Sequence, residues 1–178
     1  MNEASAPGLS RAAELRRAFD QTFAAPPGVA AEPLEDFLGV RVAGDLYALR
    51  VRELSALAKS GKIVPLPSRV PELLGLTGVR GALVPVYDLA ALLGYGSAGE
   101  NLRWLALCGA HDAIGLAFHE FEGHFRTSRS SVFAAERADA KREHVAEFVR
   151  TGTAVRAILN LPSVLAAVEK RAATAHST

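Results

Sequence analysis

The segment His119-Glu-Phe-Glu-Gly-His124 combines residue types that bind metal ions, since imidazole nitrogens and carboxylate oxygens are both zinc ligands. A helical zinc motif needs two histidines four residues apart on one face, whereas these two are five apart. On a strand, residues at an odd separation point to opposite faces, so His119 and His124 would diverge. Glu120 and Glu122 share a face, but many solvated strand carboxylates do the same. The spacing therefore argues against a metal site.

Other kinds of active site find no better support. The chain has no Gly-x-Ser-x-Gly turn for a serine nucleophile, no phosphate-binding loop with lysine, and no Gly-x-Gly-x-x-Gly after a predicted strand. Cys108 is the only cysteine, and its apolar run Trp104–Cys108 predicts a buried strand with a core thiol in a reducing compartment. We therefore expect no catalytic residue, no cofactor and no enzymatic activity.

Arg80 is the one charged residue between Glu72 and Asp88. It stands in a predicted turn, Arg80-Gly81, between two short apolar strands over 75–79 and 82–87. Glycine supplies the positive φ that such a turn needs. An isolated arginine beside a turn is either a solvated residue or a contact for a partner, and the residues alone leave both open.

The rest of the body reads as short strands with few helices, which indicates a mostly-β fold. In the first half we expect strands over 36–43 and 46–51 joined by a turn at Gly44-Asp45, a helix over 52–58 with Leu54 and Leu57 facing inward, and an edge strand over 63–66. Asp88 should cap a helix over 89–93 that Gly94 ends. In the second half we expect strands over 102–109 and 113–119, a continuation through about 127, strands over 144–150 and 154–160, a loop over 134–143 and a helix over 162–172.

Residues 1–35 differ from the body. A helix from Ser10 to about Phe23 would carry Leu15, Phe19 and Phe23 on one face, followed by a Pro-rich linker. A helix of this length is marginal alone in water, so it must dock on the protein's own body or on a partner. Both remain open.

Composition excludes several classes. The 20 basic and 19 acidic residues give no basic excess for a nucleic-acid binder. No apolar run reaches the ~20 residues of a membrane span, and the first residues lack the pattern of a signal peptide. We therefore expect a cytoplasmic protein.

The run from Gly75 to Gly94 resembles the centre of the CheW family, the adaptor domain of bacterial chemotaxis signalling. Val79-Arg80-Gly81, Pro85-Val86, Asp88-Leu89 and Leu93-Gly94 follow the family pattern in order and spacing. The segments 36–49, 63–67, 115–123 and 157–161 extend the resemblance to about residues 36–165.

The resemblance implies two packed, five-stranded SH3-like barrels, with halves of roughly 36–96 and 102–165. The expected N-terminal helix and linker over 1–35 and a C-terminal helix end and tail over 166–178 lie outside it. It also implies a non-enzymatic adaptor that couples the cytoplasmic tip of a chemoreceptor to the regulatory domain of a histidine kinase, recruited to receptor arrays without entering the membrane. The implied partner-binding residues are Arg80, Gly81, Val51, Leu54 and Leu57, to which the N-terminal stripe of Leu15, Phe19 and Phe23 is added as a further candidate.

The sequence departs from the family pattern at polar surface positions. Ala56 stands where the family has glutamate, Gly78 where it has asparagine, His119 and Asn160 where it has aspartate, and Glu147 where it has glycine. An accessory protein that competes with or modifies the main coupling protein is therefore an alternative. A more distant alternative is a small β-barrel enzyme or metal-binding protein.

Overall fold

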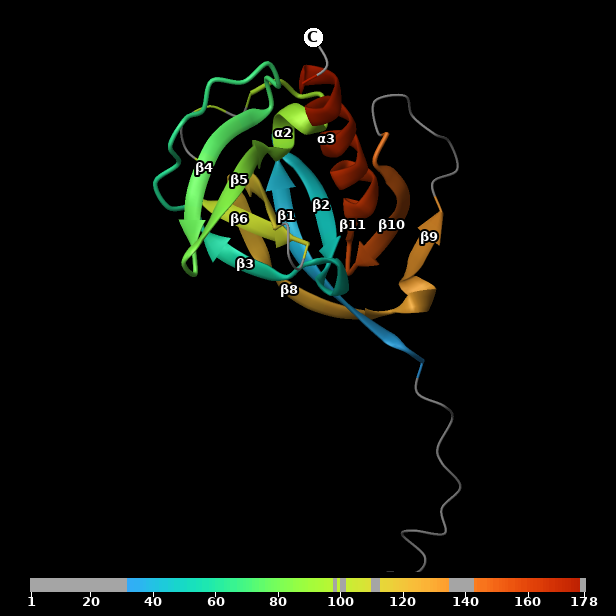
Figure 1. Ribbon diagram of the computed structural model, residues 1–178. Coiled ribbons are helices and arrows are strands. Elements are labelled where there is room, and N and C mark those ends of the chain that lie inside the picture. The colour runs from blue at the N-terminus through green and yellow to red at the C-terminus, as the bar shows by residue number, and fades with distance from the viewer. Residues whose placement is uncertain (1–31, 98, 100–101, 110–112, 135–142, 177–178) are drawn as a thin grey trace, which may run out of the picture. The chain divides into compact units, whose positions relative to one another are not determined.

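The computed structural model describes residues 32–97, 99, 102–109, 113–134 and 143–176. The predicted N-terminal helix with Leu15, Phe19 and Phe23 lies outside the described residues. From Leu34 onward the chain forms one compact unit, built from two β-sheets and a C-terminal helix (Figure 1). None of the described helices has the length and apolarity needed to cross a bilayer.

The first sheet has six strands. Their spatial order is β8 (Glu120–Ser128), β1 (Leu34–Val42), β2 (Asp45–Arg50), β11 (Ala154–Leu159), β10 (Val145–Thr151) and β9 (Val132–Ala134). Neighbours are antiparallel except for β2 and β11, which run parallel.

The second sheet has five strands. Their order is β3 (Ala56–Lys59), β6 (Trp104–Cys108), β7 (Ile114–Phe118), β5 (Ala82–Asp88) and β4 (Leu73–Val79), with a parallel pair between β5 and β7. Four short or terminal helical elements complete the unit: the 3₁₀ turns η1 (Val51–Glu53) and η2 (Arg129–Ser131), α2 (Leu89–Leu92) and α3 (Leu161–His176).

The predicted mostly-β architecture is confirmed. The order of the strands in the two sheets was not predicted from the sequence. Each sheet takes strands from both 36–96 and 102–165, because the chain changes sheets after β2 and again after β7. The midpoint of the sequence is therefore not the boundary between the sheets.

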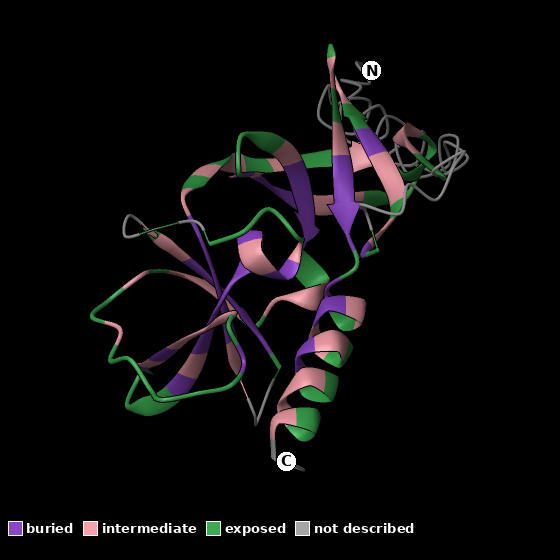
Figure 2. Cartoon of the chain, turned by 90° about the horizontal axis from the view of Figure 1, so that it is seen from above, coloured by how far each residue is buried: buried purple, intermediate pink, exposed green. Residues whose placement is uncertain are grey.

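The largest buried cluster is shared by both sheets and α3. It includes Val40 and Leu49 from the first sheet, Leu116 and Phe118 from the second, and Leu161 and Val164 from α3. Figure 2 shows buried residues along one side of α3 and exposed residues along the other. Cys108 belongs to this cluster and is fully buried, and burial together with the nearby charge of Glu53 raises the pKa of its thiol to about 12. The thiol is a core group, as predicted.

The predicted helix over 52–58 is wrong. After η1 the backbone of Leu54 is extended, Ser55 donates its N–H to the Leu107 carbonyl at 2.8 Å, and β3 pairs with β6. Pairing with a distant strand overrides the helical spacing of the leucines.

Two smaller predictions also need correction. The first hairpin turns at Ala43-Gly44, one residue earlier than expected, with φ values of 50° and 91°. The predicted strand over 63–66 is reduced to a single bridge between Val64 and Leu76, because Pro65 lacks the N–H that a longer ladder needs.

Glycine is required at position 75 because the backbone of the connector residues Val64 and Pro65 passes close to it. Its φ is +141°, and a Cβ atom at this position would lie 2.0 Å from the Val64 carbonyl oxygen and 2.8 Å from Pro65 Cα. Gly78, on the same strand, has nothing within 4 Å of the equivalent point. Close packing thus explains Gly75 but not Gly78.

Gly75→Ala should lower the free energy of unfolding by at least ~2 kcal/mol, since the methyl group would collide with backbone atoms and the φ disfavours any side chain. Gly78→Ala is the matched control and should stay within ~1 kcal/mol of the wild type. Chemical denaturation of both variants checks this. Equal effects would show that the connector does not constrain Gly75 in solution.

Candidate functional site

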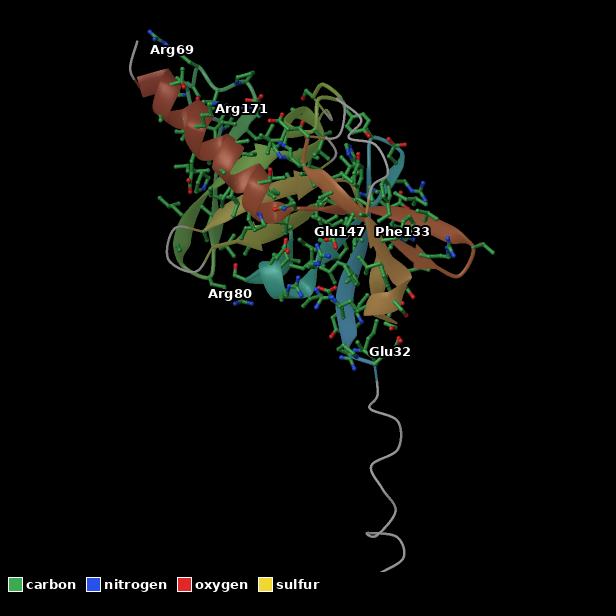
Figure 3. The ribbon with its side chains drawn as sticks, turned by 90° about the vertical axis from the view of Figure 1, so that its right-hand side faces the viewer. Glu32, Arg69, Arg80, Phe133, Glu147 and Arg171 are labelled. Carbon is green, nitrogen blue, oxygen red and sulfur yellow. The ribbon has the colours of Figure 1, made fainter. Side chains whose placement is uncertain are left out.

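The β4–β5 turn presents Arg80 to solvent. Arg80 and Gly81 have φ values of 51° and 85°, the left-handed conformations of a tight hairpin turn. Such a φ is uncommon for arginine and costs of order 1 kcal/mol, so other contacts must hold the turn. The Arg80 side chain is exposed and makes no hydrogen bond or ion pair within the described part of the chain. Figure 3 shows it pointing away from the body, where its guanidinium is free to bind a partner.

An apolar surface lies on the same hairpin. Antiparallel register places Gly78 opposite Leu83 and Leu76 opposite Pro85, while Val64 bridges to Leu76. Residues opposite each other share a face, so Val64, Leu76, Leu83 and Pro85 line one side of the hairpin, here called the hairpin face. Leu83 is 76% exposed and Val64 54% exposed. The hairpin face with Arg80 at its tip combines an exposed apolar surface with a free guanidinium, the residue types enriched in interfaces.

Sequence reasoning found Arg80 but missed Leu83. The run Ala82–Tyr87 is apolar at nearly every position, so it contains no alternation that distinguishes the exposed face from the buried one. In the structure Val84 and Val86 are buried and Leu83 is not. Only the strand pairing reveals the difference.

The other predicted contact residues lie where the chain crosses between sheets. Val51 begins η1 and is 36% exposed. Leu54 and Leu57 are half-buried and pack against the shared core, so they also contribute to stability. In Figure 1, β3 runs from η1 toward the β4–β5 turn. The structure therefore brings Val51, Leu54 and Leu57 to the seam between the sheets.

A charge cluster fixes this crossover. Arg50 has a side chain that is only 9% exposed, and it donates to Glu35 at 2.9 Å and to Glu147 at 2.6 Å. Burial alone would lower the pKa of Arg50, but the hydrogen bond and charge of Glu147, together with those of Glu35, raise it. Arg52 makes a further ion pair with Glu35 at 2.5 Å. Glu147 thus holds the end of β2 through Arg50.

The same crossover anchors the C-terminal helix. Glu53 accepts a hydrogen bond from the Leu161 N–H at 3.2 Å, and the Asn160 side chain accepts one from the Ser163 N–H at 3.0 Å. Both satisfy N–H groups at the start of α3 that have no partner within the helix. Asn160 therefore caps the start of α3.

The segment that invited a metal interpretation forms ion pairs across β1 and β8. His124 Nε2 lies 2.8 Å from Asp36 Oδ1, and Arg126 Nε lies 2.9 Å from the same oxygen. The hydrogen bond from Arg126 is the main cause that lowers the pKa of Asp36.

Glu120 and Glu122, the two glutamates of this segment, also form ion pairs. Arg41 pairs with both Glu120 and Glu122, and Arg156 pairs with Glu122 at 2.5 Å. Burial alone would raise the pKa of Glu122, but the hydrogen bonds from Arg156 and Arg41 outweigh it and lower the pKa. Within the described residues no group of three or more His, Cys, Asp or Glu side chains could hold a metal ion.

Asp88 closes the hairpin by capping α2. It is 1% exposed, and its Oδ1 accepts hydrogen bonds from the N–H groups of Ala90 at 2.9 Å and Ala91 at 3.4 Å. Gly94, with a φ of 82°, ends the helix. The predicted cap and stop are confirmed, and they place Asp88 inside the structure rather than on a binding surface.

Two interleaved sheets with one shared core define a double SH3-like barrel protein. The chain belongs to the CheW-like domain family, whose family model matches residues 36–169. Among solved structures, it is similar to the scaffolding protein TtCheW from Thermoanaerobacter tengcongensis, with a TM-score of 0.63 and 18% identity over 71% of this chain and 89% of that chain. No curated protein matches the chain. The predicted family and fold class are therefore confirmed.

Asp88→Ala should lower the free energy of unfolding by ~1 kcal/mol, since two helix N–H groups lose their acceptor. Asp88→Asn keeps an acceptor oxygen and should recover part of that loss. Thermal unfolding of both variants measures the effect. Unchanged stability accompanied by loss of partner binding would assign Asp88 to a binding surface instead.

Proposed function

We propose that this protein is a non-enzymatic adaptor that couples chemoreceptors to a histidine kinase in bacterial chemosensory signalling. The observation that carries the proposal is membership of the CheW-like family across the whole sheet body, combined with an unpartnered Arg80 beside an exposed apolar face. We place the protein in the cytoplasm, recruited to receptor arrays through these contacts.

The mechanism requires two surfaces that can be occupied together. The hairpin face suits a flat β partner such as the regulatory domain of the kinase, since apolar side chains cover one side of two paired strands. The seam at η1, with Val51 exposed and Leu54 and Leu57 half-buried, suits the helical tip of a receptor. Joining both contacts in one rigid body raises the local concentration of kinase at the receptor, which is the physical basis of coupling.

One observation favours the alternative of an accessory adaptor. Glu147 occupies the family's glycine position and forms an ion pair with the buried Arg50 directly before η1. A charged pair at the proposed receptor seam would change which receptors bind. An accessory protein would compete with the main coupling protein for the kinase while selecting a different receptor.

Arg80→Glu should weaken binding to a receptor tip fragment or to the kinase regulatory domain about tenfold, a loss of ~1.4 kcal/mol. The melting temperature should stay within ~2 °C, because the side chain is exposed and unpaired. Arg103→Glu, at an exposed position before β6, makes the same charge change and is the control. Titration calorimetry with each variant measures the effect. Equal weakening by both substitutions would show that the loss of binding reflects the general charge of the protein and not a contact made by Arg80.

Deleting residues 1–30 should leave the thermal transition of the body unchanged while reducing recruitment to the signalling complex. Burial of Leu15, Phe19 and Phe23 on a partner could contribute ~4–8 kcal/mol before ordering costs, at ~1.5–3 kcal/mol for each side chain. Calorimetric melting and co-sedimentation with receptor arrays test the two parts. If the truncated protein melts well below the full chain, the apolar stripe belongs to the protein's own core.

A further inference from the structure

A hollow of about 680 Å³ opens between the two edge strands of the first sheet. Strand β8 pairs only with β1, and β9 pairs only with β10, so each keeps one edge without a strand partner within the described residues. The turn η2 joins the two edges. The hollow is here called the seam hollow, and its lining includes Phe125, Arg126, Thr127, Phe133, Arg150 and Thr151.

Two aromatic rings give the seam hollow fixed walls. Phe125 stacks on the buried Phe37 with ring centroids 5.4 Å apart. Phe133 stacks on Phe148 at 5.9 Å, yet remains 40% exposed. The Arg150 guanidinium lies 5.7 Å from the centroid of the Phe133 ring. An exposed aromatic ring with an arginine held over it is a ready anchor for a binding partner.

The charged residues that line the seam hollow within the described part of the chain are arginines. Arg126 is balanced by Asp36, but Arg150 makes no ion pair with any described carboxylate. Arg129 is exposed in η2, next to the serines that line the hollow. Thr127 and Thr151 add hydroxyl groups to the lining. Guanidinium and hydroxyl donors around an open polar hollow fit carboxylate groups, because charge-assisted hydrogen bonds to arginine are the stronger kind.

We propose that the seam hollow binds an extended acidic peptide segment of a partner protein. Arg150 donates hydrogen bonds to a carboxylate of the peptide, and Phe133 packs against its backbone and aliphatic atoms. The edges of β8 and β9 that have no strand partner among the described residues offer main-chain groups to an extended chain, which is the geometry of strand addition. The acidic character follows from the unbalanced charge of Arg150 and Arg129.

The seam hollow is separate from the hairpin face. Figures 1 and 3 show β9, with Phe133, on the opposite side of the body from the β4–β5 turn and Arg80. The proposed peptide contact is therefore distinct from the Arg80 contact, does not depend on the proposed function and can form while Arg80 is occupied.

Fluorescence anisotropy with a rhodamine-labelled hexaglutamate peptide tests the proposal on the full chain at ~50 mM salt, where screening is weak. Saturable binding is expected. Arg150→Glu should weaken it at least tenfold, and Phe133→Ser should weaken it severalfold. Arg103→Glu makes the same charge change on the other sheet and should stay within twofold of the wild type. Arg150→Gln, which only removes the charge, keeps the test valid if Arg150→Glu lowers the melting temperature.

Three results would overturn the proposal. The first is the absence of saturable binding to the wild-type chain. The second is equal weakening by Arg150→Glu and Arg103→Glu, which would indicate general charge attraction. The third is equally tight binding of a hexaglutamine peptide, which would show that carboxylates are not recognised.

Discussion

One apolar layer between two interleaved sheets is the constraint on which the structure depends. Because the chain changes sheets after β2 and after β7, neither half of the sequence can complete a sheet or bury its apolar face alone. Helix α3 covers the same layer with Leu161 and Val164. The sheets therefore form as one body, and turns on opposite sides of that body are held at fixed positions.

Charged contacts at the crossover then orient the surfaces that face partners. Arg50 links the ends of β1, β2 and β10 through Glu35 and Glu147, while Glu53 holds the first turn of α3. The proposed receptor seam lies directly beside this cluster. An adaptor needs this rigidity, because flexible coupling between two binding surfaces would dilute the gain in local concentration.

The sequence predictions that succeeded were mostly of features set by the backbone preferences of one or two neighbouring residues. The Arg80-Gly81 turn, the Asp88 cap and the Gly94 stop each depend on one or two residues with strong backbone preferences, and each was found. The prediction of a helix over 52–58 failed because β3 is defined by its pairing with β6, which places Ala56 opposite the distant residue Leu107. The exposure of Leu83 and the pairing of Glu147 with Arg50 likewise arise from contacts that no local pattern encodes.

In the proposed function, this body holds a receptor and a kinase at the same time. An affinity pull-down of the tagged full chain from its own cells, with proteins identified by mass spectrometry, tests it most directly. A histidine kinase and chemoreceptors should co-purify together with the chain. Recovery of neither class of protein, while the tagged chain is folded and soluble in the extract, would contradict the account.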